Sequence, residues 1–334
     1  MSRDFGKYLA SLLLFGSNGI IASQIDLPSG QVVLLRTLLG SLALCAALGA
    51  SLWRRRSGAD GAASQTVAPL ACLEHPRQAA ALALSGAALG VGWIFLFAAY
   101  RLVGVGVASL AYYCGPVIVM LLSPLLFGER LTGPKLAGFG CVVLGAFLVV
   151  AQCDGSAPDP RGLALGGASA LMYAVMVVFS KRAPEVGGME AACVQMLASF
   201  AAVAAWSIAT GGLVTPGQVA GANLPAMLVL GLVNTGLGCY LYFSSLGRLP
   251  VQRVAVCGYL EPLSAVALGA LLLGESLTPG RMLGAALVVG GAAASELVGG
   301  AALGGAVDAM RDAARLAATR GRHALVRRRA VLAR

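Results

Sequence analysis

Ten apolar stretches follow one another along the 334-residue chain, and short polar segments separate them. A membrane-spanning α-helix needs about 20 predominantly apolar residues. The stretches are too long and too uniformly apolar for the alternating segments of about 10 residues that build a membrane β-barrel. The sequence therefore predicts an all-α membrane protein whose ten transmembrane helices lie near residues 5–24, 31–53, 78–100, 104–127, 133–151, 161–180, 189–211, 224–247, 253–273 and 279–298.

The composition excludes the common soluble classes. Hydrophobic residues make up 58% of the chain and charged residues 11%, whereas a soluble domain carries roughly 25% charged residues. The eight cysteines form no CxxC pair, and the only histidines, His75 and His323, fall outside the predicted helices. We therefore expect neither a disulfide framework nor a metal site or other cofactor.

The distribution of basic residues predicts the orientation. If the N-terminus is cytoplasmic, 20 of the 24 Lys and Arg residues lie on the cytoplasmic side, and only Arg101, Arg161 and Arg281 lie on the other. Such a bias is typical of cytoplasmic loops. It predicts an even number of spans, with both termini inside and the protein in the cell inner membrane.

Residues 299–334 form a basic tail outside the predicted helices. From residue 305 onward the tail carries eight Arg and two Asp. We expect it to lie on the anionic lipids of the cytoplasmic leaflet. Nucleic-acid binding is not expected, because the tail has no aromatic residue on which a base could stack.

An internal repeat links the two halves of the chain. Residues 113–146 (YCGPVIVMLLSPLLFGERLTGPKLAGFGCVVLGA) and 259–292 (YLEPLSAVALGALLLGESLTPGRMLGAALVVGGA) are identical at 14 of 34 positions, at a constant offset of 146 and without a gap. Each repeat holds five predicted helices. Because five is odd, the second copy enters the membrane from the opposite side. The sequence therefore predicts two inverted five-helix repeats, 1–152 and 153–298, an arrangement typical of secondary transporters.

The repeated Pro, the GE-x-LT motif and the Gly-rich helix that follows resemble the EamA family of the drug/metabolite transporter superfamily. The resemblance covers about residues 5–298. It implies a ten-helix inner-membrane carrier, often an exporter of amino acids or other small metabolites, and says almost nothing about the individual substrate. The glutamates of the motif, Glu129 and Glu275, belong either to a tight interhelical turn or to a gate.

Two prolines, Pro116 and Pro262, lie inside predicted spans at equivalent positions of the two repeats. A proline removes one backbone hydrogen bond and crowds the carbonyl group four residues earlier. Such a break in a span is tolerated where it lines a cavity or finds a partner. We interpret the two prolines either as kinks that face one central cavity between the halves or as simple packing kinks.

Glu261 is the most informative single residue, because it lies about eight residues inside the ninth span. An ionisable residue at this depth is a functional candidate by default. It would hold a cationic group of the substrate or carry a coupling proton; a structural pair with Arg36 or a tyrosine is the alternative. Arg36 lies about five residues inside the second span, where it either extends toward the interface or contacts a substrate carboxylate. If both side chains face the cavity, the site suits a zwitterion such as an amino acid.

Other polar and aromatic residues within the spans either join helices or line the cavity. The full set of candidate substrate-binding residues is Asn18, Arg36, Trp93, Tyr112, Tyr113, Asn234, Tyr240, Tyr259 and Glu261.

Together these features predict a secondary transporter that exports small metabolites, amino acids or related compounds, by alternating access. No nucleotide-binding motif lies in a strand–helix context, so the driving force is either proton exchange or downhill exit. Two other classes stay open: an intramembrane enzyme acting on a lipid-linked substrate, and a membrane scaffold. The enzyme would need paired acidic residues or a metal cluster at the membrane face, and the sequence offers neither, so an enzyme is not expected.

Overall fold

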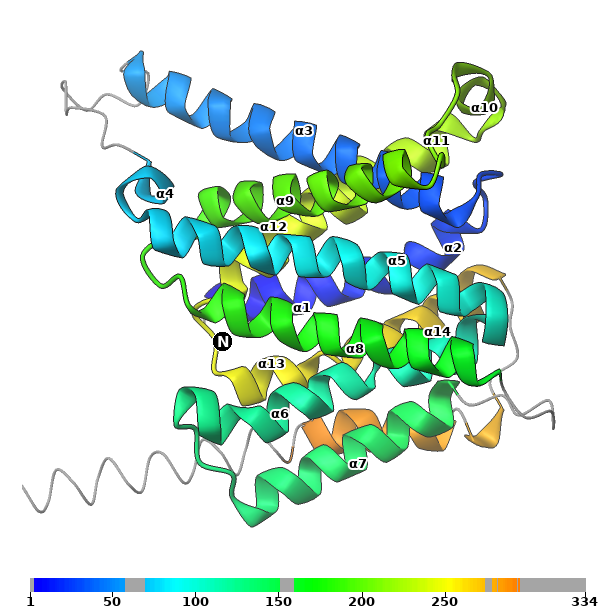
Figure 1. Ribbon diagram of the computed structural model, residues 1–334. Helices are drawn as coiled ribbons and strands as arrows, with labels where there is room; N and C mark the ends of the chain where they lie inside the picture. Colours follow the sequence, from blue (N-terminus) through cyan, green and yellow to red (C-terminus); the bar gives the residue numbers. More distant parts are fainter. Residues whose placement is uncertain are drawn as a thin grey trace, which may run out of the picture.

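A computed structural model describes residues 3–57, 70–150, 159–273, 278–280, 282–292 and 294, and within these ranges the protein is helical and has no strand (Figure 1). The basic tail and the predicted repeat boundaries at residues 152 and 298 lie outside these ranges. The helices are α1 (Arg3–Gly16), α2 (Asn18–Ala22), α3 (Ser29–Arg56), α4 (Ala71–Glu74), α5 (Pro76–Tyr112), α6 (Cys114–Phe127), α7 (Gly133–Val150), α8 (Pro160–Lys181), α9 (Gly188–Ala209), α10 (Pro216–Gly221), α11 (Leu224–Leu228), the π-helix η1 (Val229–Leu237), α12 (Gly238–Leu246), α13 (Val251–Cys257) and α14 (Leu260–Leu273).

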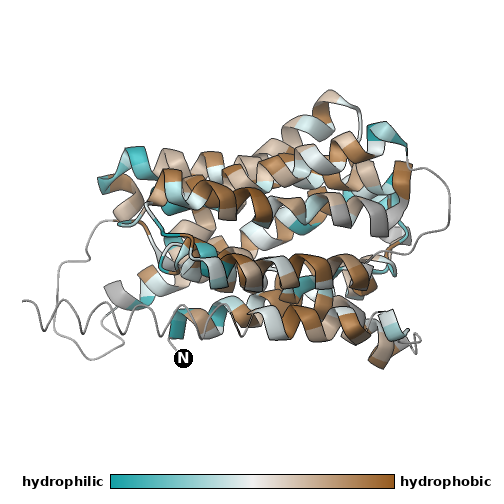
Figure 2. Ribbon diagram, turned by 90° about the horizontal axis from the view of Figure 1, so that it is seen from below, coloured by the Kyte–Doolittle hydropathy of each residue, from teal (hydrophilic) through white to brown (hydrophobic). Residues whose placement is uncertain are grey.

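Among the residues that the structure describes, seven helical segments are long and apolar enough to cross a membrane, and three shorter apolar helices accompany them: Cys114–Phe127, Gly133–Leu148 and Met282–Ala292. Each of these ten segments coincides with one predicted span. The fold is therefore the all-α membrane fold that the apolar stretches predict. Hydrophobic residues dominate the helices between their ends in Figure 2, and large side chains such as Leu125 and Leu271 are exposed there, as expected of a surface that faces lipid.

The helix α5 contains the third predicted span and the first residues of the fourth, whose remainder is α6, so the helix break lies near Tyr113 rather than near Arg101. The chain nevertheless reverses direction within α5. Ser85 on α5 contacts Met176 of α8, and the Gly92 carbonyl accepts a hydrogen bond from Ser169. This first part of α5 therefore runs antiparallel to α8. Further along, Ala111 packs against Gly166. The later contacts advance along both helices together, so the last part of α5 runs parallel to α8.

The repeated Gly-Glu pair has a clear structural reason in the first repeat. Gly128 ends α6 in the left-handed conformation (φ 65°), which glycine adopts without steric cost. The turn then directs Glu129 to the start of α13 in the other repeat. Its Oε1 accepts a hydrogen bond from the Val251 N–H (2.7 Å) and its Oε2 accepts one from the Gln252 N–H (3.0 Å). Glu129 thus links the two halves of the chain, while Glu275 lies outside the described residues.

The two repeats meet through a reciprocal glycine contact. A Cβ added to Gly145 would lie 2.6 Å from the carbonyl oxygen of Gly284, and one added to Gly291 would lie 2.6 Å from that of Gly138. The offset of 146 relates Gly138 to Gly284 and Gly145 to Gly291. Equivalent helices therefore cross in opposite directions around a pseudo-two-fold axis, as inverted repeats require.

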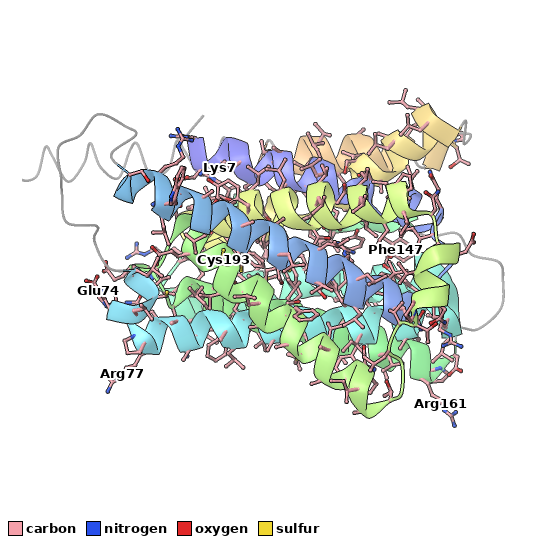
Figure 3. The ribbon with its side chains drawn as sticks, turned by 90° about the horizontal axis from the view of Figure 1, so that it is seen from above. Lys7, Glu74, Arg77, Phe147, Arg161 and Cys193 are labelled. Atoms are coloured by element: carbon pink, nitrogen blue, oxygen red, sulfur yellow. The ribbon has the colours of Figure 1, made fainter. Side chains whose placement is uncertain are left out.

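Charged residues mark the two ends of the bundle. Lys7, Glu74 and Arg77 lie at one end, and Arg161 lies at the other (Figure 3). We refer to the first as the N-terminal end. Its polar contacts include an ion pair between Arg248 and Asp4 (3.6 Å) and a hydrogen bond from the Lys181 ammonium to the Leu249 carbonyl.

Candidate functional site

A pocket with about 600 Å³ of empty space, part of it open to solvent, forms a central cavity in the bundle where α1, α5, α6, α8, α12 and α14 meet. Most of its wall is aromatic, and its polar side chains include Asn18 and Glu261. Its full lining is Leu12, Phe15, Asn18, Leu89, Trp93, Tyr112, Tyr113, Pro116, Tyr173, Met176, Cys239, Tyr242, Phe243, Gly258 and Glu261. Both repeats contribute to this wall, which is the position of a transporter's substrate site.

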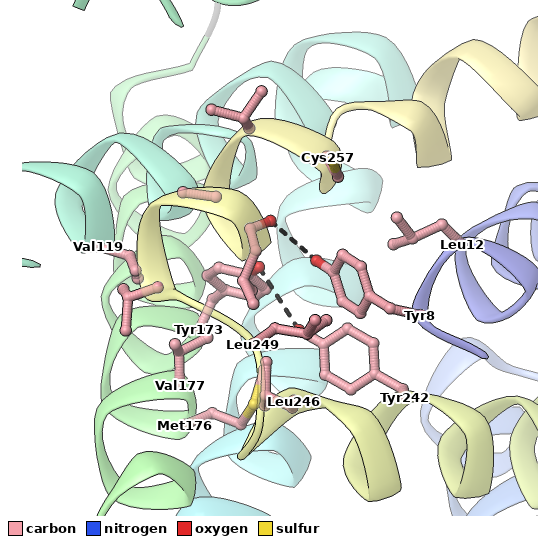
Figure 4. Close-up of a cluster of buried hydrophobic side chains, with 14 of the residues drawn as sticks. Tyr8, Leu12, Val119, Tyr173, Met176, Val177, Tyr242, Leu246, Leu249 and Cys257 are labelled. Carbon is pink, nitrogen blue, oxygen red and sulfur yellow. Dashed lines mark hydrogen bonds between the residues drawn. The ribbon is translucent and has the colours of Figure 1, made fainter. Parts of the chain in front are cut away.

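The tyrosines of the wall contact one another. The rings of Tyr112 and Tyr173 meet edge to face with centroids 5.7 Å apart. The hydroxyl oxygens of Tyr173 and Tyr242 are 3.5 Å apart, and Tyr8 packs beside Tyr242 with its hydroxyl bonded to the Val254 carbonyl (2.8 Å) (Figure 4). Electron-rich ring faces attract cations as well as apolar groups, so the wall suits both.

Glu261 is the second residue of α14, directly after the interruption of the helix between α13 and α14. Its backbone N–H still bonds to the Gly258 carbonyl (3.2 Å), which holds the side chain against the cavity. It is the one charged residue of the wall, and no ion pair or side-chain hydrogen bond engages its carboxyl group within the described part of the chain. The carboxyl group is therefore available to a ligand.

Arg36 is 4% exposed and lies behind the wall rather than in it. Its guanidinium stacks on the Trp93 ring, 4.5 Å from the centroid, and its Nε donates to Thr235 Oγ1 (3.0 Å). The Nη2 atom is buried and has no hydrogen-bond partner among the residues that the structure describes. The charges of Arg36 and Glu261 interact, although the two groups form no direct ion pair.

Asn18 and Asn234 occupy different places. Asn18 is in the wall, at the start of α2, where the first span breaks. Asn234 is buried on η1 and donates to Ser17 Oγ (2.7 Å) and Asn18 Oδ1 (3.1 Å). It therefore orients Asn18 and stabilises the break without lining the cavity itself.

The remaining candidate residues fall into two groups, inside and outside the cavity wall. Tyr112, Tyr113, Trp93 and Pro116 belong to the wall. Three others do not. Tyr259 is fully buried, Tyr240 lies near the Lys7 ammonium (5.6 Å), and Pro262 is buried in the first turn of α14.

Phe15, Tyr173, Tyr242 and Phe243 are wall residues that the sequence analysis did not select. All four lie within predicted spans, away from any proline or charge. Tyr173 lies near the middle of the sixth span, and this depth was the one available signal, because a tyrosine hydroxyl in lipid needs a polar partner.

The sequence profile of the EamA-like transporter family matches residues 7–151 and again residues 160–295. The chain belongs to the EamA-like transporter family. The double match agrees with the repeat seen in the sequence and with the paired glycine contacts.

Several relatives in this family have names that specify export. A probable amino-acid metabolite efflux pump of Salmonella typhimurium is 29% identical over 210 residues, 59% of this chain and 69% of the relative. The aromatic amino acid exporter YddG of Ancylobacter novellus is 28% identical, over 61% of this chain and 71% of the relative. The threonine/homoserine exporter RhtA of Escherichia coli is 26% identical, over 62% and 68%. These EamA-like relatives are named as transporters rather than enzymes.

A solved crystal structure matches the fold with a TM-score of 0.70 at 22% identity, and the match covers 89% of this chain and 98% of the other. At this identity the likeness concerns the EamA-like fold alone.

Proposed function

We propose that the protein is a secondary transporter that exports amino acids or closely related small metabolites across the inner membrane by alternating access. The observation that carries this proposal is the central cavity, walled by both repeats and holding, among aromatic rings, one carboxyl group that forms no direct ion pair within the described residues. The family and the named relatives support transport of a small molecule, and the names of the relatives favour export.

The substrate class follows from two groups that lack partners. Glu261 offers a carboxyl group to a substrate ammonium, and the tyrosine faces around it attract the same charge. Arg36 lies behind the wall, and its buried, unbonded Nη2 would bind a substrate carboxylate once the wall beside Trp93 opens during the transport cycle. A buried donor without a partner costs free energy, so a ligand that supplies the acceptor is favoured. A zwitterion with an apolar side chain satisfies both groups and the aromatic wall.

The orientation follows from the charges. Arg77 and Lys7 lie at the N-terminal end of the bundle (Figure 3), and the Lys and Arg bias supports a cytoplasmic location for this end. Export then means that substrate enters at the N-terminal end and leaves at the other. The basic tail extends this charge, and we propose that it binds anionic lipids of the inner leaflet.

Transport in vesicles tests the proposal. Purified protein is reconstituted, and the movement of a pool of labelled amino acids is measured with and without a pH gradient. We expect wild type to move a subset of them and Glu261→Gln to lose this movement. The matched control is Glu74→Gln, which removes an exposed carboxyl group outside the cavity and should leave transport intact.

The pH gradient separates the two roles of Glu261. Acceleration by the gradient that disappears in Glu261→Gln would indicate a coupling proton on this side chain. Transport that ignores the gradient but needs Glu261 would indicate substrate binding alone. Thermal denaturation serves to check that the wild-type protein is folded. The proposal fails if folded wild-type protein moves no labelled metabolite.

A further inference from the structure

A second cavity, with about 530 Å³ of empty space that is partly open to solvent, lies nearer the N-terminal end of the bundle, between α5, α8, α9 and α12. The residues that line this cavity range from exposed to buried. Gly187, Gly247 and Arg248 are exposed and form the mouth. Ser180 and Ser244 are buried, with 3% and 4% exposure, and form the inner part. The cavity therefore leads inward from one face of the membrane.

The second cavity and the central cavity lie along the same helices. On α8, Met176 is in the central wall and Ser180, four residues later, is in the wall of the second cavity. On α5, Leu82 and Leu89 are related in the same way. At 1.5 Å per residue these pairs are about 6 Å and about 10 Å apart along their helices. One to two helical turns therefore separate the cavities.

Phe243 is the residue that separates them. Of the described residues, it alone belongs to both walls, and it is 3% exposed. Its ring meets that of Tyr242 edge to face, with centroids 5.3 Å apart. Phe243 belongs to the same buried cluster as Met176 and Val177 of α8 and Leu246 of α12, which Figure 4 labels. A rigid apolar ring at this level blocks passage of a polar solute.

The other helices at this level are fixed to one another. Ser85 Oγ lies 2.7 Å from the Met176 carbonyl oxygen and 2.6 Å from Gln195 Oε1. These contacts tie α5, α8 and α9 together beneath the second cavity. All three groups are buried, and buried hydrogen-bonded groups are costly to separate. Opening at this level is therefore easier by movement of α12, which carries Phe243.

The chain provides a means for that movement. The nine residues of η1 directly precede α12 and are π-helical, and Thr235 Oγ1 donates to the Leu230 carbonyl five residues earlier (2.8 Å). A π-helix is uncommon and less favourable than an α-helix, and such segments occur often at functional sites. A return of part of η1 to α-helical bonding would rotate α12 and turn the Phe243 ring.

We propose that the second cavity is the vestibule of the transport path and that the Phe243 ring is the gate between it and the central cavity. This inference rests on the proposed transport function, but its test does not require the substrate. Cys239, which is 2% exposed and lies in the central wall, serves as the reporter. The rate at which a reagent reaches it from the vestibule measures the barrier at Phe243.

The experiment uses the full chain with the seven other cysteines replaced by serine or alanine. A small, membrane-impermeant methanethiosulfonate with a quaternary ammonium group is added to inside-out and right-side-out vesicles, and labelling of Cys239 is timed. We expect slow labelling from the N-terminal face when Phe243 is present. Phe243→Ala should raise this rate at least about tenfold, equivalent to a barrier lowered by about 1.4 kcal/mol. Phe243→Leu should give a smaller rise, and it replaces the alanine variant if that variant does not fold.

Leu246→Ala is the matched control. Leu246 is fully buried on α12, three residues beyond Phe243, and belongs to neither wall. An equal rise in this variant would show general loosening and overturn the assignment. A cysteine at Ser180, in a background without Cys239, should be labelled from the N-terminal face. No labelling there would overturn the vestibule.

The two proposals can fail separately. Unchanged Cys239 labelling in both Phe243 variants, with substrate transport intact, rejects the gate alone. Faster labelling in Phe243→Ala without transport of any metabolite supports the connection between the cavities and rejects the proposed function.

Discussion

Tyr259 donates a hydrogen bond from its hydroxyl to the backbone carbonyl of Tyr113, 2.6 Å away, and Tyr113 is the residue at the same position of the other repeat. The two rings also pack with centroids 6.0 Å apart. The bond crosses the pseudo-two-fold axis, yet it is not reciprocal, because Tyr113 lines the cavity while Tyr259 is buried. One copy of the repeated tyrosine is thus buried between the repeats, and the other lines the cavity.

The bond predicts an effect of Tyr259→Phe on stability. The variant keeps the ring but leaves the Tyr113 carbonyl without its partner, at a cost of about 1–3 kcal/mol. We expect a lower thermal denaturation midpoint in detergent. Tyr240→Phe is the control, because the hydroxyl of Tyr240 has no hydrogen bond within the described residues. Equal midpoints for wild type and Tyr259→Phe would contradict the bridging role.

The glycine crossing predicts opposite effects for two alanines on the same helix. A Cβ at Gly145 meets the Gly284 carbonyl at 2.6 Å, so Gly145→Ala must push the two helices apart. Overpacking of this kind costs about 1–3 kcal/mol. At Gly140, also on α7, a Cβ meets nothing within 4 Å. Gly140→Ala should leave the midpoint unchanged or raise it, since alanine favours helix by up to about 1 kcal/mol. A midpoint for Gly145→Ala at or above that of Gly140→Ala would refute the close crossing.

The spans could be predicted from the sequence, because the thickness of the membrane sets the length and hydropathy that each spanning helix needs, and each apolar stretch shows both. The repeat at offset 146 also indicated which helices are equivalent. The cavity was harder to predict. Arg36 lies in a span, but only the fold reveals that its guanidinium stacks on Trp93 behind the wall.

Tyr173 and Phe243 could not be recognised as cavity residues from the sequence for a related reason. In a span, an aromatic side chain that faces lipid and one that faces a cavity have the same local sequence. The rotation of α8, which carries Tyr173, depends on packing against α5, and the rotation of α12, which carries Phe243, depends on packing against α1 and α9; these partners are distant along the chain. Glu261 and Asn18 were accessible to prediction because polar groups are rare in lipid and therefore point inward.

The bond between the two halves at Glu129 predicts that this side chain stabilises the bundle. Glu129→Ala removes two charge-assisted hydrogen bonds from the first N–H groups of α13 and should cost about 2 kcal/mol or more. We expect a clear fall of the denaturation midpoint, and a smaller one for Glu129→Gln, which can still accept one bond. Glu74→Ala, at the same end of the bundle, is the control. A midpoint unaffected by Glu129→Ala would mean that the cap contributes nothing.

Cys72 allows a prediction about pH. Burial, and then the nearby Glu190 carboxylate, raise the pKa of the Cys72 thiol above its ordinary value, and Glu190 Oε2 also accepts a hydrogen bond from the Cys72 N–H (3.1 Å). Since the thiolate is the reactive form, alkylation of Cys72 should be slow at neutral pH. Its rate should continue to increase at alkaline pH values at which the rate of an ordinary thiol has already levelled off. Glu190→Gln keeps the acceptor but removes the charge, so the rate profile should move to lower pH. Glu185→Gln should not move it, and an unshifted profile in Glu190→Gln would exclude the electrostatic cause.

If the protein transports amino acids as proposed, the stacked guanidinium of Arg36 predicts that it distinguishes an amino acid from the matching amine. Arg36→Lys keeps the charge but loses the planar stack on Trp93 and the fork of donors that includes the free Nη2. If Nη2 binds the substrate carboxylate, transport of the amino acid at low concentration should fall about tenfold or more, the equivalent of one charge-assisted hydrogen bond. Transport of the matching amine, which has no carboxylate, should change little. Arg77→Lys, at the N-terminal end, is the control. Equal losses for the amino acid and the amine would mean that Arg36 only supports Trp93 and that the substrate carboxylate lies elsewhere.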